Sequence, residues 1–368
     1  MNLRGIRGVA AAGGPRERSV MAIKHEAVVL VLGEVSQDLR GEMFSPHVDK
    51  SAPLYYAHSV PRQVAIGKVV APVGGQDVTF ELRGYSPDVL LIQARITLKD
   101  VFTPATFDAE ARLLEKARAI LREHGGSVDF SEEYTVFVVS GFTGPAEQFL
   151  EHSQIIASLL KSERQELAAR EIEYTLQSQI KYARDDLAVI DWDGAFVFDP
   201  EGDVGQEIEL LTLANLQLLR HRTLDRLLDE RLARMADLVR RPGGSTLALK
   251  IKDIEKGVVE IINARTQSIT ELQRLERDVK LIGDWYSARF FDVAAGKFKL
   301  ADWRRSIQGK LESIEDIYSI MAENFSVSRK HRAEWVQIVA FFVLQLGWFA
   351  LIMLELYYFT RQISAHGE

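Results

Sequence analysis

The chain has 368 residues, of which 47% are apolar, so it is long enough for one large or two ordinary domains with a real hydrophobic core. Its 45 basic and 52 acidic residues give a net charge of −7, which disfavours a general grip on nucleic acid, and we expect no direct DNA binding. The absence of cysteine excludes disulfides, thiolate nucleophiles and iron–sulfur clusters. No catalytic motif appears, so we predict no catalytic residue, metal or cofactor.

Residues 1–22 are set apart from the expected fold as a disordered or misassigned start. They hold four arginines against one acid, which is typical of a transit peptide. Met21, however, opens a typical native beginning, MAIKHEAVVLVLGEV. We favour the misassigned start.

The prolines divide the rest of the chain. Eight of the ten lie at or before Pro145, and none follows Pro242. Because proline breaks helix interiors, this asymmetry predicts β-containing structure first and long helices later.

Residues 23–144 are expected to form an α+β domain of a mixed, ferredoxin-like type. Strands are predicted from apolar runs bounded by turn residues, with a Gly74-Gly75 hairpin turn between two of them, and one helix from its periodic apolar positions. The expected strands are 26–35, 63–71, 77–82, 89–98 and 134–140, and the expected helix is 106–123.

Residues 145–204 are expected to complete this α+β part. A helix is predicted from Pro145 to about Arg184, because proline suits a helix N-terminus. Two short apolar runs within residues 187–198 then flank Asp193-Gly194, which predicts a β-hairpin with a type I′ turn.

The same stretch contains the one acidic cluster that could hold a metal. It consists of Asp191, Asp193, Asp199 and Asp203. Turn chemistry is the favoured interpretation, because Asp-Gly is what the hairpin itself requires and no complete calcium-binding loop is present.

Residues 205–330 are expected to form a long helical hairpin or coiled-coil-like region. Helices are predicted from Gly205 to Arg241, from Thr246 to about Ile282 and from about Ala301 to Ser328, with a linker containing Gly283 and Gly296 before the last. The apolar spacing in the second helix fits an intramolecular hairpin or an oligomer seam equally well.

The strongest local signal is the apolar run Trp335–Phe359, within residues 331–360. It contains no Lys, Arg or Asp and a single Glu. As a helix it would be roughly 37 Å long, enough to cross a hydrocarbon core of about 30 Å. We therefore expect one transmembrane helix followed by a short tail at 361–368, which makes a tail-anchored protein.

Two sets of polar residues accompany this segment. The basic residues before it keep the N-terminal domain in the cytoplasm, or in an equivalent compartment such as the mitochondrial matrix, by the positive-inside rule: they are Arg329, Lys330 and Arg332. Inside the segment, the polar face consists of Gln337 and Glu355, which share one side, and Gln345, which lies about 80° from them. We expect this polar stripe to lie at a helix–helix interface or to line a pore, and Gln345 falls near the midplane, where an amide needs a partner.

The C-terminal part resembles the "required for meiotic nuclear division" family of membrane proteins. The resemblance is carried by the helix Ala214-Asn215-Leu216-Gln217-Leu218-Leu219 with Asp225, by Gly283-Asp284-Trp285-Tyr286, and by the spacing from Lys310-Leu311 to Arg332 and Glu334-Trp335. Ala333 stands where the family usually has leucine. The resemblance implies a one-span, self-associating membrane protein that supports translation near the membrane, with no established catalytic residues.

These observations favour a non-enzymatic membrane scaffold or tether that is a homo-oligomer with a protein or ribosomal partner. One alternative is an oligomeric ion-transport component, similar in plan to CorA-type channels but lacking their Gly-Met-Asn signature and second span. The other is a membrane-anchored metal-dependent enzyme that would use the acidic cluster around Asp191 and Asp193.

Overall fold

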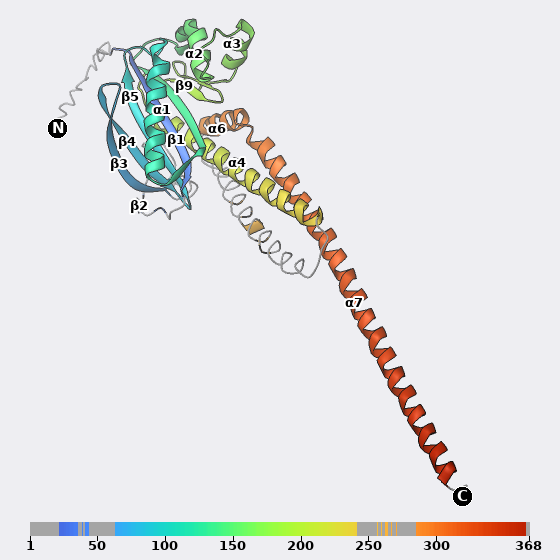
Figure 1. Ribbon diagram of the computed structural model, residues 1–368. Helices are drawn as coiled ribbons and strands as arrows, with labels where there is room; N and C mark the ends of the chain where they lie inside the picture. Colours follow the sequence, from blue (N-terminus) through green and yellow to red (C-terminus); the bar gives the residue numbers. More distant parts are fainter. Residues whose placement is uncertain are drawn as a thin grey trace, which may run out of the picture. The chain divides into compact units, whose positions relative to one another are not determined.

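A mixed β-sheet organises the N-terminal part of the chain in this computed structural model (Figure 1). Its strands are β1 (Lys24–Val35), β2 (Glu42–Met43), β3 (Gln63–Val73), β4 (Gln76–Tyr85), β5 (Val89–Leu98), β6 (Gly126–Ser140), β7 (Gln179–Ile180), β8 (Leu187–Ile190) and β9 (Gly194–Phe198). The described strands follow the order β2-β3-β4-β5-β1-β6-β9-β8-β7. Neighbours pair antiparallel except β6 and β9, which run parallel.

The structure describes residues 22–35, 39, 41–43, 63–240 and 285–365, together with isolated positions between 256 and 270. Residues 1–21 of the predicted start, most of the predicted helix from Thr246 to Ile282, and Gly283 therefore lie outside the described residues. The chain forms two compact units, one comprising residues 1–225 and 264–305 and the other residues 226–263 and 306–368.

Strand β1 lies at the centre of the sheet because it is apolar on both faces. It pairs with β5 on one side and β6 on the other. Since successive side chains of a strand point to opposite faces, its apolar run feeds two separate cores. Ala27, Val29 and Val31 enter one core, and Val28, Leu30 and Leu32 enter the other.

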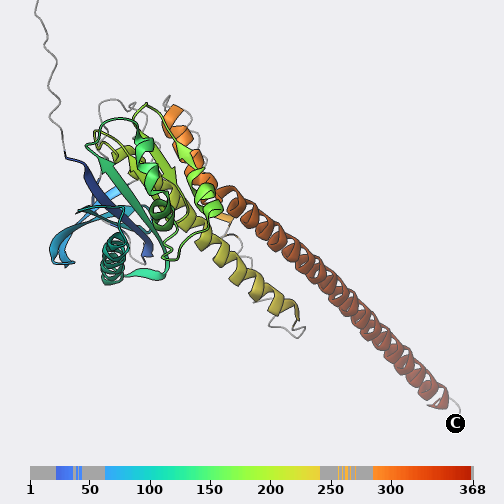
Figure 2. The same cartoon turned by 90° about the horizontal axis from the view of Figure 1, so that it is seen from above.

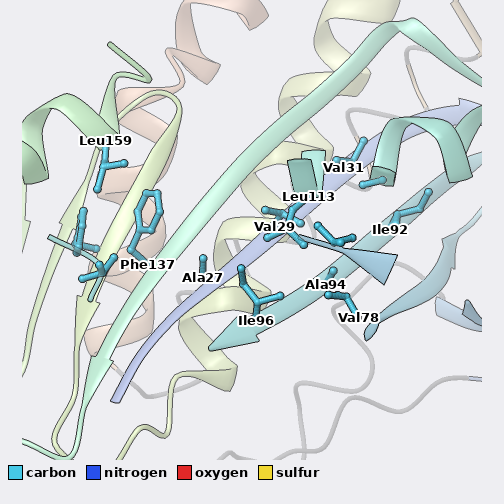
Figure 3. Packing of buried hydrophobic residues seen from close by; sticks show 14 of the residues in the cluster. Ala27, Val29, Val31, Val78, Ile92, Ala94, Ile96, Leu113, Phe137 and Leu159 are labelled. Carbon is cyan, nitrogen blue, oxygen red and sulfur yellow. The ribbon is translucent and has the colours of Figure 1, made fainter. Parts of the chain in front are cut away.

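Helices α1 (Ala105–Glu123) and α2 (Ser153–Leu160) cover the first core. Figure 3 shows Leu113 of α1 above Val29 and Ile92 of the sheet, with Leu159 of α2 near Phe137 of β6. Helix α1 places apolar residues at helical spacing on this face, so the predicted helix at 106–123 is confirmed to within one residue.

The second core lies under the N-terminal part of helix α4 (Gly205–Arg240) and under helix α6 (Trp285–Lys297). The views in Figures 1 and 2 both place α1 and α4 on opposite faces of the sheet. Leu211, Ala214 and Leu218 are buried against the sheet, as their spacing predicts, and α6 adds Phe290 and Phe291. Both faces of the sheet are therefore covered, which explains the continuous apolar runs of its central strands.

The second unit combines the C-terminal part of α4 with helix α7 (Leu300–Ala365). Lys310 Nζ of α7 lies 2.6 Å from Asp229 Oδ1 of α4, and Leu228, Leu311 and Ile314 are buried. Helix α7 continues without a break through the apolar segment predicted to cross the membrane. The predicted fold class is confirmed, because the chain has a mixed α/β sheet domain, then helices, then one apolar C-terminal helix. The sheet is larger than a ferredoxin-like one, which has four strands, since nine strands are described here.

The predicted single helix from Pro145 to Arg184 is wrong. The structure has a 3₁₀ helix, η2 (Ala146–His152), followed by α2, α3 (Ala169–Leu176) and the edge strand β7. Helix α2 ends where Ser162 adopts a left-handed φ of 48°. Since such a residue stops an α-helix, α2 and α3 are two separate helices, although both pack against the first core.

Two turn predictions also need correction. The hairpin at 187–198 forms, and the Asp191 N–H donates to the Gly194 carbonyl oxygen at 2.9 Å, so Trp192 and Asp193 lie at its tip. Neither residue has the positive φ that a type I′ turn requires. Gly194 opens β9 with no positive φ, and its lack of a Cβ serves close packing instead, because a Cβ there would lie 2.8 Å from the Thr135 carbonyl oxygen. Gly296, predicted in a linker, lies within α6 because this segment carries an apolar face that packs on the sheet.

Candidate functional site

The most exposed apolar surface among the described residues is a segment of α7. Glu334–Leu356 is 23 residues long with a mean hydropathy of 2.1, and all of its residues are exposed. This is the one described helix that is long and apolar enough to cross a membrane, and it coincides with most of the predicted Trp335–Phe359. Solvent-exposed apolar patches of this size mark a surface that is covered by lipid or protein.

The three polar residues predicted in this segment are exposed, and they do not share one face. Gln337 and Glu355 are five helical turns apart and lie on one side, whereas Gln345 is rotated from them by about 80°. Gln345 lies instead in a shallow groove of about 450 Å³. The groove is lined by Phe342, Gln345, Leu346, Trp348, Phe349 and Ile352.

The residues of the Lys310 to Trp335 motif, which resembles the "required for meiotic nuclear division" family, lie along α7 and contribute mainly to packing and to the start of the apolar segment. Lys310 is held by the ion pair to Asp229, and Leu311 is buried in the second unit. Glu334 and Trp335 begin the exposed apolar segment. The predicted topology residues Arg329, Lys330 and Arg332 lie in α7, but their side chains are outside the described residues.

Asp191, the most buried member of the predicted acidic cluster, is neutralised by two lysines. Its Oδ1 lies 3.2 Å from Lys297 Nζ of α6, and its Oδ2 lies 3.4 Å from Lys161 Nζ after α2. Its backbone carbonyl accepts a hydrogen bond from the Tyr134 hydroxyl at 3.1 Å. Asp191 is therefore bonded to three other parts of the fold, and the two ammonium groups occupy the positions that a cation would take.

Electrostatic effects around Asp191 agree with this assignment. Burial would lower the pKa of Lys161, but Glu171 and Asp191 outweigh it, so the pKa lies above its ordinary value. Burial and the charge of Asp191 raise the pKa of the Asp193 carboxyl. Complete burial, reinforced by Asp191 and Asp193, raises the pKa of Tyr134. Burial and the mutual charges of these groups account for all three shifts.

Asp199 confirms the turn-chemistry interpretation of the acidic run. Its Oδ1 accepts hydrogen bonds from the backbone N–H groups of Glu201 and Gly202 at 2.9 and 2.6 Å. Such bonds are typical of an aspartate that shapes its own turn. Among the described residues, no three His, Asp or Glu side chains are arranged to hold a metal ion.

A buried polar network that the sequence did not reveal ties α4 to the sheet. Glu209 Oε2 lies 3.0 Å from Arg83 Nη1, and Glu209 Oε1 accepts a hydrogen bond from Gln63 Nε2 at 2.6 Å. The Tyr85 hydroxyl donates to the same oxygen at 3.3 Å, and Arg83 also donates to Gln93. The available signal was one carboxylate in the otherwise uncharged stretch 208–219, because a charge on a buried face needs a partner.

Two further carboxyls have pKa values well above the ordinary value for glutamate. Burial, with a contribution from Asp193, raises the pKa of Glu110 on α1 to about 7. Burial, together with the charges of Asp199 and Asp203, raises the pKa of Glu207 on α4 to about 7. Glu207 is hydrogen-bonded to Tyr286 at the start of α6. Burial is the largest cause of both shifts, so the stability of the fold should depend on pH.

Comparison with known proteins finds a family match and a relative that are both described as uncharacterised. Residues 22–204 match the family described as "Uncharacterized protein MJ0711, N-terminal domain". The chain is also 26% identical over 250 residues to "Uncharacterized protein MJ0711" from Methanocaldococcus jannaschii, an alignment covering 68% of this chain and 72% of that protein.

No solved structure gives a significant match to the chain. The family match begins just before β1 and ends just before α4, so it covers the strands of the sheet and the helices on its first face. The aligned length of 250 residues extends beyond this region. The N-terminal half of this chain is thus similar to the N-terminal domain of an uncharacterised protein family, the one described by MJ0711.

Proposed function

We propose that this protein is a membrane-anchored scaffold that holds its α/β sheet domain at a membrane surface. The observation that carries the proposal is the fully exposed apolar segment Glu334–Leu356. Transfer of such a segment into hydrocarbon is strongly favourable, and a helix satisfies its own backbone hydrogen bonds there. The polar groups around Asp191 and Glu209 are used in fixing helices to the sheet, which supports a structural role for the domain.

The proposed orientation places the sheet domain on the cytoplasmic side or its organellar equivalent. Arg329, Lys330 and Arg332 precede the segment, and a single Arg361 follows it. Positive residues are retained on the cytoplasmic side during insertion.

The proposed partner is the translation machinery, bound through protein. This part rests on the resemblance of the C-terminal helices to the "required for meiotic nuclear division" family. The net charge of −7 favours a protein surface over direct binding of ribosomal RNA. We therefore propose a tether that holds ribosomes near the membrane.

The two alternatives have weaker support. An ion path needs several copies of the span around one axis, and each copy offers single polar residues at different angles. A metal-dependent enzyme would use Asp191, whose carboxylate already faces Lys161 and Lys297.

Membrane anchoring is tested by placing charge inside the segment. Leu344→Lys with Leu351→Lys puts two ammonium groups at exposed central positions of the span, each costing about 2.5–3.5 kcal/mol of insertion free energy. The wild-type protein should stay in the membrane pellet after alkaline carbonate extraction, and the double variant should not. The matched control, Ile23→Lys with Val70→Lys, adds the same charge to the exposed surface of the sheet domain and should stay in the pellet. Extraction of the wild type, or retention of the span variant, would contradict anchoring.

The tether is tested by purifying the full-length protein from its native membrane in mild detergent. Ribosomal components should copurify with the wild type and with the control variant, and they should be lost with the Leu344→Lys, Leu351→Lys variant. Purification of a homo-oligomer without any ribosomal component would contradict the proposed tether to ribosomes.

A further inference from the structure

The apolar segment of α7 carries a seven-residue repeat on one face. Its positions alternate in steps of four and three residues, which is the spacing of a helix–helix seam. They are Ile338, Phe342, Gln345, Phe349, Ile352 and Leu356. All are exposed, and four of them, Phe342, Gln345, Phe349 and Ile352, line the groove described above.

Gln345 is the one polar member of this face, and it is the central residue of Glu334–Leu356. At about 1.5 Å per residue it lies roughly 16 Å from either end, so its amide cannot reach the water interface. No described residue forms a hydrogen bond with that amide. A carboxamide carries both donors and acceptors, which makes it complementary to an identical amide at the same depth.

On this basis, and resting on the proposed membrane anchoring, we infer that the span pairs with a second copy of this chain through the seam of Ile338, Phe342, Gln345, Phe349, Ile352 and Leu356. Two copies inserted with the same orientation are parallel, so Gln345 of each lies at the same depth. The two amides then donate to and accept from one another. The flanking Phe and Ile side chains pack above and below this layer, in a left-handed crossing of about 20°.

Two other faces of the segment could compete for this role. The face of Gln337 and Glu355 also contains Leu344 and Leu351, but its polar residues lie about 12–15 Å from Gln345 along the axis, close enough to the interfaces to be hydrated. The opposite face contains Gly347 with Val343 and Leu354, and it offers close approach but no polar group. Only the seam of Gln345 satisfies an amide that lipid leaves without a hydrogen bond.

The absence of native cysteine makes the seam directly testable in the full-length protein. Single cysteines are introduced at Phe342 or Phe349 in the seam, at Leu344 or Leu351 on the first competing face, and at Val343 or Leu354 on the second. Mild oxidation in membranes should form disulfide-linked dimers at the two seam positions and little at the other four, because a disulfide requires Cα atoms within about 7 Å. Equal cross-linking at all six, or a maximum at Leu344 and Leu351 or at Val343 and Leu354, would overturn the assignment.

The role of the amide is tested in the Phe342→Cys background. Gln345→Leu should lower the fraction of cross-linked dimer through a loss of roughly three- to thirtyfold in the association constant, the range measured for polar contacts between membrane helices. Gln345→Asn keeps an amide and should retain most of the dimer, and Gln337→Leu should change nothing. Equal cross-linking with Gln345→Leu and with the wild-type glutamine would contradict the amide pair.

Carbonate extraction of the same samples separates this inference from the proposed function. Normal membrane retention without a seam pattern overturns the seam and leaves anchoring intact. Release of the wild-type protein from the membrane overturns both.

Discussion

At the scale of single residues, the folded protein contains buried carboxyls, and it is more stable when they are protonated. Glu110 is 5% exposed, and burial with the nearby charge of Asp193 raises its pKa from 4.5 to about 7. The folded state therefore binds this proton more tightly than the unfolded chain. Its contribution to stability is complete below about pH 4.5 and is lost as the pH rises through about 7.

We predict that Glu110→Gln removes this loss of stability at high pH. Up to about 3 kcal/mol of unfolding free energy should be regained at pH 8, because each unit of pKa shift corresponds to about 1.4 kcal/mol. Denaturant unfolding of the full-length protein in detergent at pH 5 and pH 8 measures the effect. Glu115→Gln, at an exposed position of the same helix, is the control. An unchanged pH dependence in the Glu110→Gln variant would show that this carboxyl is not the source.

At the scale of the elements, the parallel pair β6–β9 depends on how closely the two strands approach. Thr135 of β6 is the register partner of Gly194, the first residue of β9. This pairing joins the β8–β9 hairpin, with Asp191 in its turn, to the rest of the sheet. The glycine that the sequence offered as a turn residue is needed for this approach.

We predict that Gly194→Ala lowers the free energy of unfolding by about 1–3 kcal/mol, the usual cost of forcing extra atoms into a packed site. The new Cβ would meet a backbone oxygen, which can move only if the strand moves. Gly67→Ala in β3 is the matched control, because a Cβ there has nothing within 4 Å. Denaturant midpoints of the two variants compare them directly, and equal midpoints would rule out the close-packing explanation.

At the scale of the whole molecule, one sequence combines a sheet domain buried on both faces with a helix segment exposed on all sides. These two designs suit different solvents. An apolar stretch that no described part of the protein covers is stable in lipid, whereas a sheet with two cores is stable in water. The proposed orientation follows from the charges beside the segment, which differ between its two ends.

We predict that the two ends of the segment lie on opposite sides of the membrane. A single cysteine at Val70, which is exposed in the sheet domain, should resist a membrane-impermeant maleimide in intact cells. A single cysteine at Ser364 should be labelled. Both should react after lysis, and labelling at Val70 alone in intact cells would reverse the orientation.

The sequence by itself determined the features that depend on local pattern. The apolar run of β1, the Gly74-Gly75 turn, the periodicity of α1 and the apolar segment of α7 each involve residues within one element, and the structure has all four. It failed from Pro145 to Arg184, where the proline indicated the start of a helix but not the breaks between η2, α2, α3 and β7.

Only the tertiary structure decided the order of the strands and the partners of buried charges. Glu209 meets Arg83 across 126 positions of sequence, and Asp191 meets Lys297 across 106. Neither pair has a local pattern, because each forms only when the sheet brings distant segments together. These long-range contacts also place Asp191 in two ion pairs, with Lys161 and Lys297. Its position in the sequence had allowed two interpretations, a metal ligand or a turn residue.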